Sequence, residues 1–224
     1  MGFFSMEKII ETVAFILDGD FTRRVVRELV GFNPTPAHIE TFCRSVITVD
    51  ERIRGAAYYD CPPFFGIRPL PISGIPHDFK THLAYWKALS FQEELLKNNF
   101  FSYRIGKLSF DGWRLKGEVI KELMAGPRPL SDSDFEPILV QKQVDMMIGL
   151  DIAKLSTTRF VDRLILVTAD SDFIPAIQMA RSKGMKVTIV TGNTKIIKKK
   201  LLRACDEHRD VSHLVHPANL SHLP

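Results

Sequence analysis

The three cysteines of this chain, Cys43, Cys61 and Cys205, are far apart and odd in number. They lack the paired spacing of a disulfide framework or a zinc site, so we expect reduced thiols in a cytoplasmic protein. The seven histidines show no ligand spacing such as HExxH. No apolar run is long enough to span a membrane, and neither repeats nor low-complexity blocks occur. We therefore expect no export signal, no lipid anchor and no membrane segment.

The bulk composition is that of a folded protein with a large core. Of the 224 residues, 45% are hydrophobic and 25% are charged, which is sufficient for one large α/β domain. The net charge of +4 is compatible with a polyanionic partner but does not require one. We expect a single domain over residues 1–224, with its core at about 10–192 and a basic helix and tail at 193–224.

Short apolar runs alternate with helix-like segments along most of the chain. This alternation predicts right-handed crossovers and a mainly parallel central sheet. Segments 61–76 and 126–137 contain prolines and glycines and are expected to be loops. Residues 100–110 are expected to form a hairpin with residues 113–119 through Asp111-Gly112. The other predicted strands are 13–17, 53–59, 164–167 and 185–190, and the predicted helices are 22–30, 37–46, 77–96, 144–155, 173–183 and 194–203.

Two of the predicted strands end in clustered acids. Asp18 and Asp20 follow the first strand, Asp170 and Asp172 follow the strand at 164–167, and Asp145 stands where a helix should begin. The functional crevice of a parallel sheet lies at the carboxyl ends of its strands. A single aspartate is more often a helix cap. Several converging carboxylates repel one another, and a hard divalent cation such as Mg²⁺ or Mn²⁺ relieves that repulsion.

A cation held by carboxylates suits the hydrolysis of a phosphodiester. The ion makes a bound water nucleophilic and neutralises charge on the phosphate and the leaving oxygen. Such a reaction needs no serine or cysteine nucleophile. The acid clusters therefore predict metal-assisted hydrolysis.

Four motifs, taken in order, resemble the NYN domain family, which comprises PIN-like domains of the LabA type. The resemblance covers roughly residues 10–192 and implies a three-layer α/β/α PIN-like (Rossmann-like) fold. It also implies a metal-dependent ribonuclease acting on RNA, in which Asp18, Asp145, Asp170 and Asp172 are the catalytic and metal-binding residues. The motifs are Asp18-Gly-Asp20, Tyr58-Tyr-Asp60, Lys142-Gln-Val-Asp145 with Leu150-Asp151, and Thr168-Ala-Asp170-Ser-Asp172-Phe173-Ile-Pro175.

The chain departs from the family pattern at two places. Family members often have asparagine where Phe21 stands, and here an extra acid, Asp20, precedes it. Thr168-Ala169 occupies a place where Ser-Gly is common, which is a conservative change for a tight turn. We interpret Asp20 as an auxiliary acid.

Further residues are expected near the site in supporting roles. Thr168 and Ser171 bring hydroxyls toward the metal-bound water, although capping is the alternative for Ser171. Asp151 follows Asp145 by six residues and is expected to support the site rather than to bind the ion. Lys142 is expected to reach a phosphate or, alternatively, to be merely solvated.

A basic helix is expected at residues 194–203. Lys195, Lys198 and Lys199 are candidate contacts to RNA phosphates, and Lys200 and Arg203 belong to the same segment. An ordinary solvated face fits the pattern equally well. The aromatic residues between positions 58 and 113 could stack on bases, but most are interpreted as core. Whether the chain forms a homodimer is left open.

Two alternative functions are consistent with parts of the sequence. Asp18-Gly-Asp20-Phe-Thr22 satisfies the Asp-x-Asp-x-Thr pattern of haloacid-dehalogenase-type phosphatases, in which Asp18 would be the nucleophile and Asp20 the general acid and base. That alternative leaves Asp145 without a role. The other alternative is a non-catalytic RNA-binding module in which the acids are only structural.

Overall fold

The computed structural model describes residues 10–192 and 197–214. The contacts of the chain divide it into two compact units. The sheet unit takes in the described residues up to Asp60, Glu94–Arg104, and the described residues from Val144 onwards. The inserted unit consists of Cys61–Glu93 and Ile105–Gln143. The expectation of a single domain stays a prediction. No helix of the described residues is long and apolar enough to cross a membrane.

A six-stranded sheet is the framework of the first unit, with the strand order β10-β9-β8-β1-β2-β5. β1 pairs in parallel with β2 and β8, and the pairs β8 with β9 and β9 with β10 are also parallel. The central strand is buried from Val13 to Leu17, as expected for a parallel strand covered on both faces. The strands are β1 Glu11–Asp18, β2 Glu51–Asp60, β5 Phe101–Ile105, β8 Arg163–Val167, β9 Lys186–Thr191 and β10 Glu207–Asp210.

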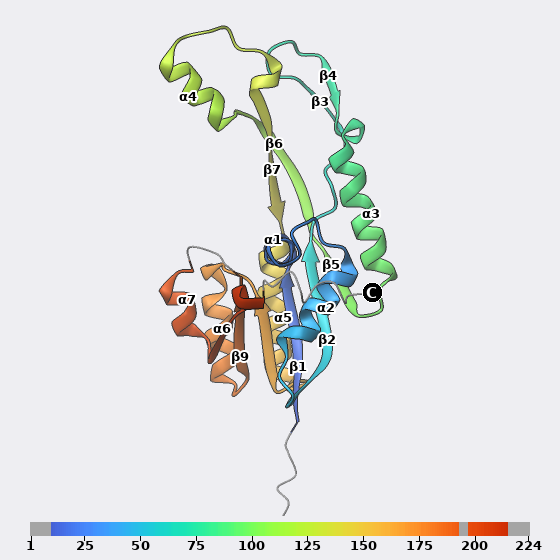
Figure 1. The fold of residues 1–224 in the computed structure, drawn as a ribbon, viewed down its shortest axis with the longest axis vertical. Coiled ribbons are helices and arrows are strands. Elements are labelled where there is room, and N and C mark those ends of the chain that lie inside the picture. Colours follow the sequence, from blue (N-terminus) through green and yellow to red (C-terminus); the bar gives the residue numbers. More distant parts are fainter. Residues whose placement is uncertain (1–9, 193–196, 215–224) are drawn as a thin grey trace, which may run out of the picture. The chain divides into compact units, whose positions relative to one another are not determined.

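Two groups of helices cover the sheet (Figure 1). α1 Gly19–Val30 packs on β1 and β2 and contacts α2 Pro36–Val46. α5 Val144–Thr158 packs on β2, and its neighbour α6 Ile174–Ser182 packs on β9 and contacts α7 Lys199–Ala204. Right-handed crossovers place the two groups on opposite faces. The predicted three-layer α/β/α fold with a mainly parallel sheet is confirmed.

Helix α1 shows how the sequence sets these elements. Its inward stripe consists of Phe21, Val25 and Val26, all buried, while Arg24 and Arg27 are exposed. Gly31 ends the helix in the left-handed conformation, with φ of +80°, and its N–H donates to the carbonyl of Arg27. The predicted stop at this glycine is confirmed.

One strand of the sheet was missed. β10 reads Glu-His-Arg-Asp and contains no apolar residue, so periodicity gives no strand signal for it. It is an edge strand that extends the sheet beyond β9. Of the helix expected at 194–203, the structure describes a helical turn from Lys199 onwards, and residues 193–196 lie outside the described residues.

The inserted unit combines two antiparallel pairs with short helices. β3 Ile67–Pro69 pairs with β4 Pro76–Asp78, and β6 Lys107–Leu115 pairs with β7 Phe135–Lys142. The helical elements are the 3₁₀ turns η1 Phe79–Thr81 and η2 Asp132–Asp134, the helix α4 Gly117–Ala125, and the beginning of α3 Leu83–Lys97. The expected loop at 61–76 therefore holds a short hairpin strand.

Two predictions for this unit are wrong. Asp111-Gly112 does not turn the chain, because Gly112, with φ of +96°, lies within β6 at a register irregularity against β7. The second hairpin strand expected at 113–119 does not form, because residues 113–115 continue β6 and α4 begins at Gly117. The helix expected at 77–96 begins only at Leu83, since His77 belongs to β4 and pairs with Arg68.

Candidate active site

Asp18 lies where β1 ends and α1 begins. Its Oδ1 accepts a hydrogen bond from the backbone N–H of Phe21 at 3.3 Å, so Asp18 caps the helix. Its Oδ2 accepts one from the hydroxyl of Thr168 at 3.4 Å. The next residue must be glycine, because a Cβ on Gly19 would lie 2.5 Å from the carbonyl oxygen of Tyr59. The first acidic turn is thus held closely against the neighbouring strand.

The second acidic turn follows β8, the strand beside β1. Leu17 and Val167 are partners in the parallel register, so Asp18 and Thr168 leave the sheet at the same edge. The Thr168 hydroxyl also accepts from the N–H of Asp170 at 3.1 Å, and Asp170 Oδ1 accepts from the N–H of Asp172 at 2.9 Å. A single buried hydroxyl therefore connects the two acidic turns.

Asp145 lies in the first turn of α5 and brings a third segment to this edge. Partial burial raises its pKa, and the negative charges of Asp170 and Asp172 raise it further. Burial also raises the pKa of Asp18 to about 6, with the charges of Asp20 and Asp145 acting in the same direction. Carboxylates from three distant segments therefore lie close enough to repel one another.

None of the four predicted metal-binding carboxylates forms an ion pair with a described residue. Acids at the opposite edge of the same sheet are neutralised. Glu51 pairs with Arg209 at 2.7 Å and Arg163 at 3.2 Å, and Arg163 also pairs with Glu11 at 3.0 Å and Glu207 at 2.7 Å. Burial raises the pKa of Glu51, but the hydrogen bonds from Arg209 and the N–H of Thr48 and the charges of Arg209 and Arg163 together lower it below its ordinary value. The four carboxylates at the carboxyl edge therefore differ from Glu11, Glu51 and Glu207, because their charge is not neutralised by a described arginine or lysine.

The donors at the carboxyl edge suit a hard divalent cation. Carboxylate oxygens are the ligands that Mg²⁺ and Mn²⁺ prefer. Within the described part of the chain, no three acidic, histidine or cysteine side chains already surround a single point as metal ligands. The side chains of Asp145 and Asp172 are exposed and able to change rotamer. Metal binding by this set stays a prediction.

The two auxiliary acids are occupied by other partners. Asp20 is exposed and pairs with Arg24 at 3.2 Å, with Arg23 at 4.0 Å. Asp151 accepts hydrogen bonds from the hydroxyl of Tyr59 at 2.7 Å and from Nε of Arg104 at 3.1 Å. Asp151 is therefore held by two neighbouring strands, and its supporting role stays a prediction.

Basic side chains approach the second acidic turn. Nζ of Lys198 donates to the hydroxyl of Ser171 at 3.2 Å. Lys200 and Arg203 line a hollow of about 580 Å³ together with Ser171 and Asp172. Lys200 and Arg203 were not among the predicted RNA contacts, although their spacing of three on a helix would place them on one face. A strip of positive charge thus lies beside the acids.

The other predicted lysines are Lys142, Lys195 and Lys199. Lys199 is exposed at the first position of α7. Lys195 lies outside the described residues. Lys142 is exposed at the end of β7 and belongs to the inserted unit.

One supporting group was not identified from the sequence. Asp60, buried at the end of β2, forms an ion pair with Arg23 of α1. Arg23 also donates to the hydroxyl of Tyr58 at 3.0 Å, and that hydroxyl donates to the carbonyl of Gly19 at 3.1 Å. These contacts fix the first turn of α1 against β2 and so hold Asp18 in place. The sequence signal that could have identified this role of Asp60 is its position directly at the end of a predicted strand.

The sheet order, the helix layers and the acids at one edge define a PIN-like α/β protein. A crystal structure of a protein of unknown function from Vibrio parahaemolyticus matches this fold with a TM-score of 0.51 and 16% identity, over 94% of this chain and 98% of that one. At this identity the likeness shows the fold alone.

The family model of the NYN domain matches residues 129–212, which confirms the predicted resemblance for this segment. The segment contains Asp145, Asp170 and Asp172, whereas Asp18 lies outside it. An uncharacterized protein from Methanocaldococcus jannaschii is 36% identical over 56 residues. Those residues are 25% of this chain and 23% of the relative, so the chain matches less than a quarter of that relative's length.

Proposed function

We propose that this protein is a metal-dependent ribonuclease that hydrolyses RNA phosphodiester bonds at the carboxyl edge of its sheet. The observation that carries the proposal is the contrast between the two edges. Acids at one edge are paired with arginines, and Asp18, Asp145, Asp170 and Asp172 at the other have no basic partner among the described residues. The NYN match supports a nuclease, because the domain is generally one of nucleases and suggests RNA as the substrate.

The four carboxylates would hold Mg²⁺ or Mn²⁺, which supplies a nucleophilic water and neutralises charge on the phosphate when bound. Thr168 and the N–H of Phe21 orient the two oxygens of Asp18. The N–H of Asp172 orients the carboxylate of Asp170. These hydrogen bonds fix the direction of the acceptor oxygens before a substrate arrives.

The basic strip beside the acids suits the phosphate backbone of the substrate. Lys200 and Arg203 line the same hollow as Asp172, so adjacent phosphates of a strand would meet positive charge next to the acidic centre. Lys198 extends this strip through its contact with Ser171. Binding at these residues is expected to weaken as salt concentration rises.

The phosphatase alternative has less support from the geometry. It requires Asp20 to act as general acid and base, but the Asp20 carboxylate is exposed and pairs with Arg24 at 3.2 Å. It also gives no role to Asp145, whose pKa is raised in part by the nearby negative charges of Asp170 and Asp172. The ribonuclease proposal gives all four acids one purpose.

The test is a cleavage assay on end-labelled, unstructured RNA with Mg²⁺, with Mn²⁺ and with EDTA. We expect cleavage with either metal and none with EDTA. Asp170→Asn should lower the rate by about 100-fold or more, because loss of even an indirect metal contact costs 10–100-fold. Asp20→Asn, an exposed acid in the neighbouring turn, is the matched control and should retain most activity. EDTA-resistant cleavage, or full activity of Asp170→Asn, would contradict the proposal, and RNA binding without cleavage would favour the binding module.

A further inference from the structure

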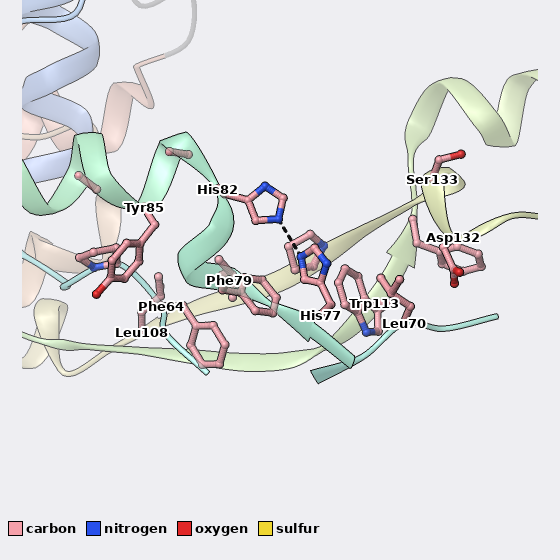
Figure 2. Close-up of a pocket in the computed structure, with 16 residues that line it drawn as sticks. Phe64, Leu70, His77, Phe79, His82, Tyr85, Leu108, Trp113, Asp132 and Ser133 are labelled. Atoms are coloured by element: carbon pink, nitrogen blue, oxygen red, sulfur yellow. Dashed lines mark hydrogen bonds between the residues drawn. The ribbon is translucent and has the colours of Figure 1, made fainter. Parts of the chain in front are cut away.

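The inserted unit contains an aromatic pocket of about 640 Å³, shown in Figure 2. Phe79 and Trp113 are nearly parallel, with ring centroids 5.9 Å apart and an interplanar angle of 24°. Phe64 meets Phe79 edge to face at 4.9 Å. The indole N–H of Trp113 donates to the carbonyl of Pro69 at 2.9 Å, which fixes the orientation of the ring. The pocket therefore presents flat, preorganised apolar surfaces.

Polar groups stand at defined places in this apolar pocket. His77 and His82 face each other with their Nε2 atoms 2.8 Å apart, close to Phe79 and Trp113 in Figure 2. Asp132 lies with Ser133 at the other end of the pocket. One oxygen of Asp132 accepts from the N–H of Ile72 at 2.9 Å and from that of Ser73 at 3.2 Å. A carboxylate has about four acceptor sites, so Asp132 can also accept from a ligand.

Positive charge lies over Phe64, which lines the pocket, and over Phe65 and Phe110, which are in the same unit but do not line it. The guanidinium of Arg68 lies 5.4 Å from the centroid of Phe64, which lines the pocket, and 5.5 Å from that of Phe110. Nζ of Lys80 lies 5.5 Å from the centroid of Phe65. Neither cation forms an ion pair with a carboxylate among the described residues. Both can therefore meet an anion next to the aromatic surface.

We infer that this pocket binds unpaired bases of single-stranded RNA. Bases offer a flat ring to Trp113, which Phe79 supports from within the unit, edges with donors and acceptors to the imidazoles and to Asp132, and phosphates to nearby cations. An apolar peptide would use only the rings and would make no use of the imidazoles, of Asp132 or of the guanidinium of Arg68 beside Phe64. The choice of RNA as the ligand rests on the proposed function, and the pocket adds a second place where the substrate is held.

Binding to the full chain can be followed through Trp113. The chain has two tryptophans, and Trp86→Phe leaves Trp113 as the single fluorescent reporter. The titration is performed in EDTA, so that no metal-dependent cleavage occurs, with a short oligoadenylate and with an abasic oligonucleotide of the same length. We expect quenching by oligoadenylate and at least about tenfold weaker binding of the abasic strand, as for the loss of a stacked base.

Variants then test whether RNA binds at the pocket or elsewhere on the surface. Trp113→Ala should weaken oligoadenylate binding about tenfold, measured by anisotropy of a labelled strand. Trp86→Ala is the matched control, because this second tryptophan is 55% exposed and does not line the pocket. Tyr85→Ala, on the exposed helix wall of the pocket, should also weaken binding and guards against misfolding of the Trp113 variant.

Three results would overturn the inference: equal affinity for the abasic strand, equal effects of the two tryptophan variants, or quenching by a proline-rich peptide but not by RNA. Failure of the proposed function is distinguishable. Base-dependent binding without cleavage in Mg²⁺ or Mn²⁺ would leave the pocket inference intact and remove the ribonuclease. If the wild type cleaves RNA and Trp113→Ala binds RNA with unchanged affinity, the ribonuclease proposal stands and the pocket inference fails.

Discussion

Replacing Asp18 by asparagine should stabilise the metal-free protein at pH 8. The asparagine side chain has nearly the same shape and is an equally good helix cap. Its oxygen can accept from Thr168 or from the N–H of Phe21, as Asp18 does now. The change removes a negative charge from a partly buried position that also faces Asp145. The substitution therefore removes the unfavourable negative charge and keeps the helix cap.

The magnitude follows from the pKa. Burial raises the pKa of Asp18 from 3.8 to about 6. Ionised Asp18 would then destabilise the fold by up to about 3 kcal/mol, since a tenfold change in dissociation constant is worth about 1.4 kcal/mol. Because the side chain keeps some contact with solvent, we expect about 1–2 kcal/mol. The folded state binds the proton more tightly, so stability is lost as pH rises from about 4 to about 6 and the variant's advantage is complete above pH 7.

Urea unfolding in EDTA at pH 4.5 and pH 8 measures this difference. The variant should exceed the wild type at pH 8 by about 1–2 kcal/mol and at pH 4.5 by only about a third of that difference. Adding Mg²⁺ should stabilise the wild type more than the variant, because only an ion that binds the folded state shifts the equilibrium. Asp20→Asn is the control for an exposed charge. A variant less stable than the wild type at pH 8, or equally favoured at both pH values, would refute the reasoning.

Three further outcomes are expected. At a Mg²⁺ concentration too low to saturate the site, cleavage by the wild type should increase as pH rises toward about 6, because burial raises the pKa of metal-free Asp18 to about 6 and the protonated acid cannot bind the ion; a flat profile between pH 5 and 8 at that concentration would contradict this. Gly19→Ala should lower the free energy of unfolding by about 2 kcal/mol, because its Cβ would clash with the carbonyl of Tyr59; an unchanged urea midpoint would be inconsistent with the close approach. Arg209→Met should cost about 3 kcal/mol, since buried Glu51 loses its closest partner, and a calorimetric transition at the wild-type temperature would argue against that ion pair.

The sheet and the acidic turns were predictable because their signals are local. Residues 13–17 and 164–167 are unbroken apolar runs, and such runs become buried parallel strands. Aspartates directly after them must lie at the carboxyl edge. Glycines at positions 31 and 184, both with positive φ, end helices as expected.

The remaining features depend on partners that are distant in sequence. Asp111-Gly112 favours a turn by itself, and only pairing with β7 keeps it within a strand. The polar strand β10 exists because β9 offers it an edge. The amino-edge ion pairs join Arg163 to Glu11, 152 positions away, which no local pattern indicates. The pocket likewise requires rings from separate segments of the inserted unit to meet.

The position of β1 between β2 and β8 has a consequence for protein synthesis. The register pairs Val13 with Arg163 and Leu17 with Val167, so the first strand to leave the ribosome has one open edge until residue 167 has emerged. Such long-range pairing slows folding and leaves an apolar strand exposed to chaperones in the meantime. Because Asp18 meets Thr168 only after that moment, the two acidic turns cannot come together in a nascent chain that ends before residue 167.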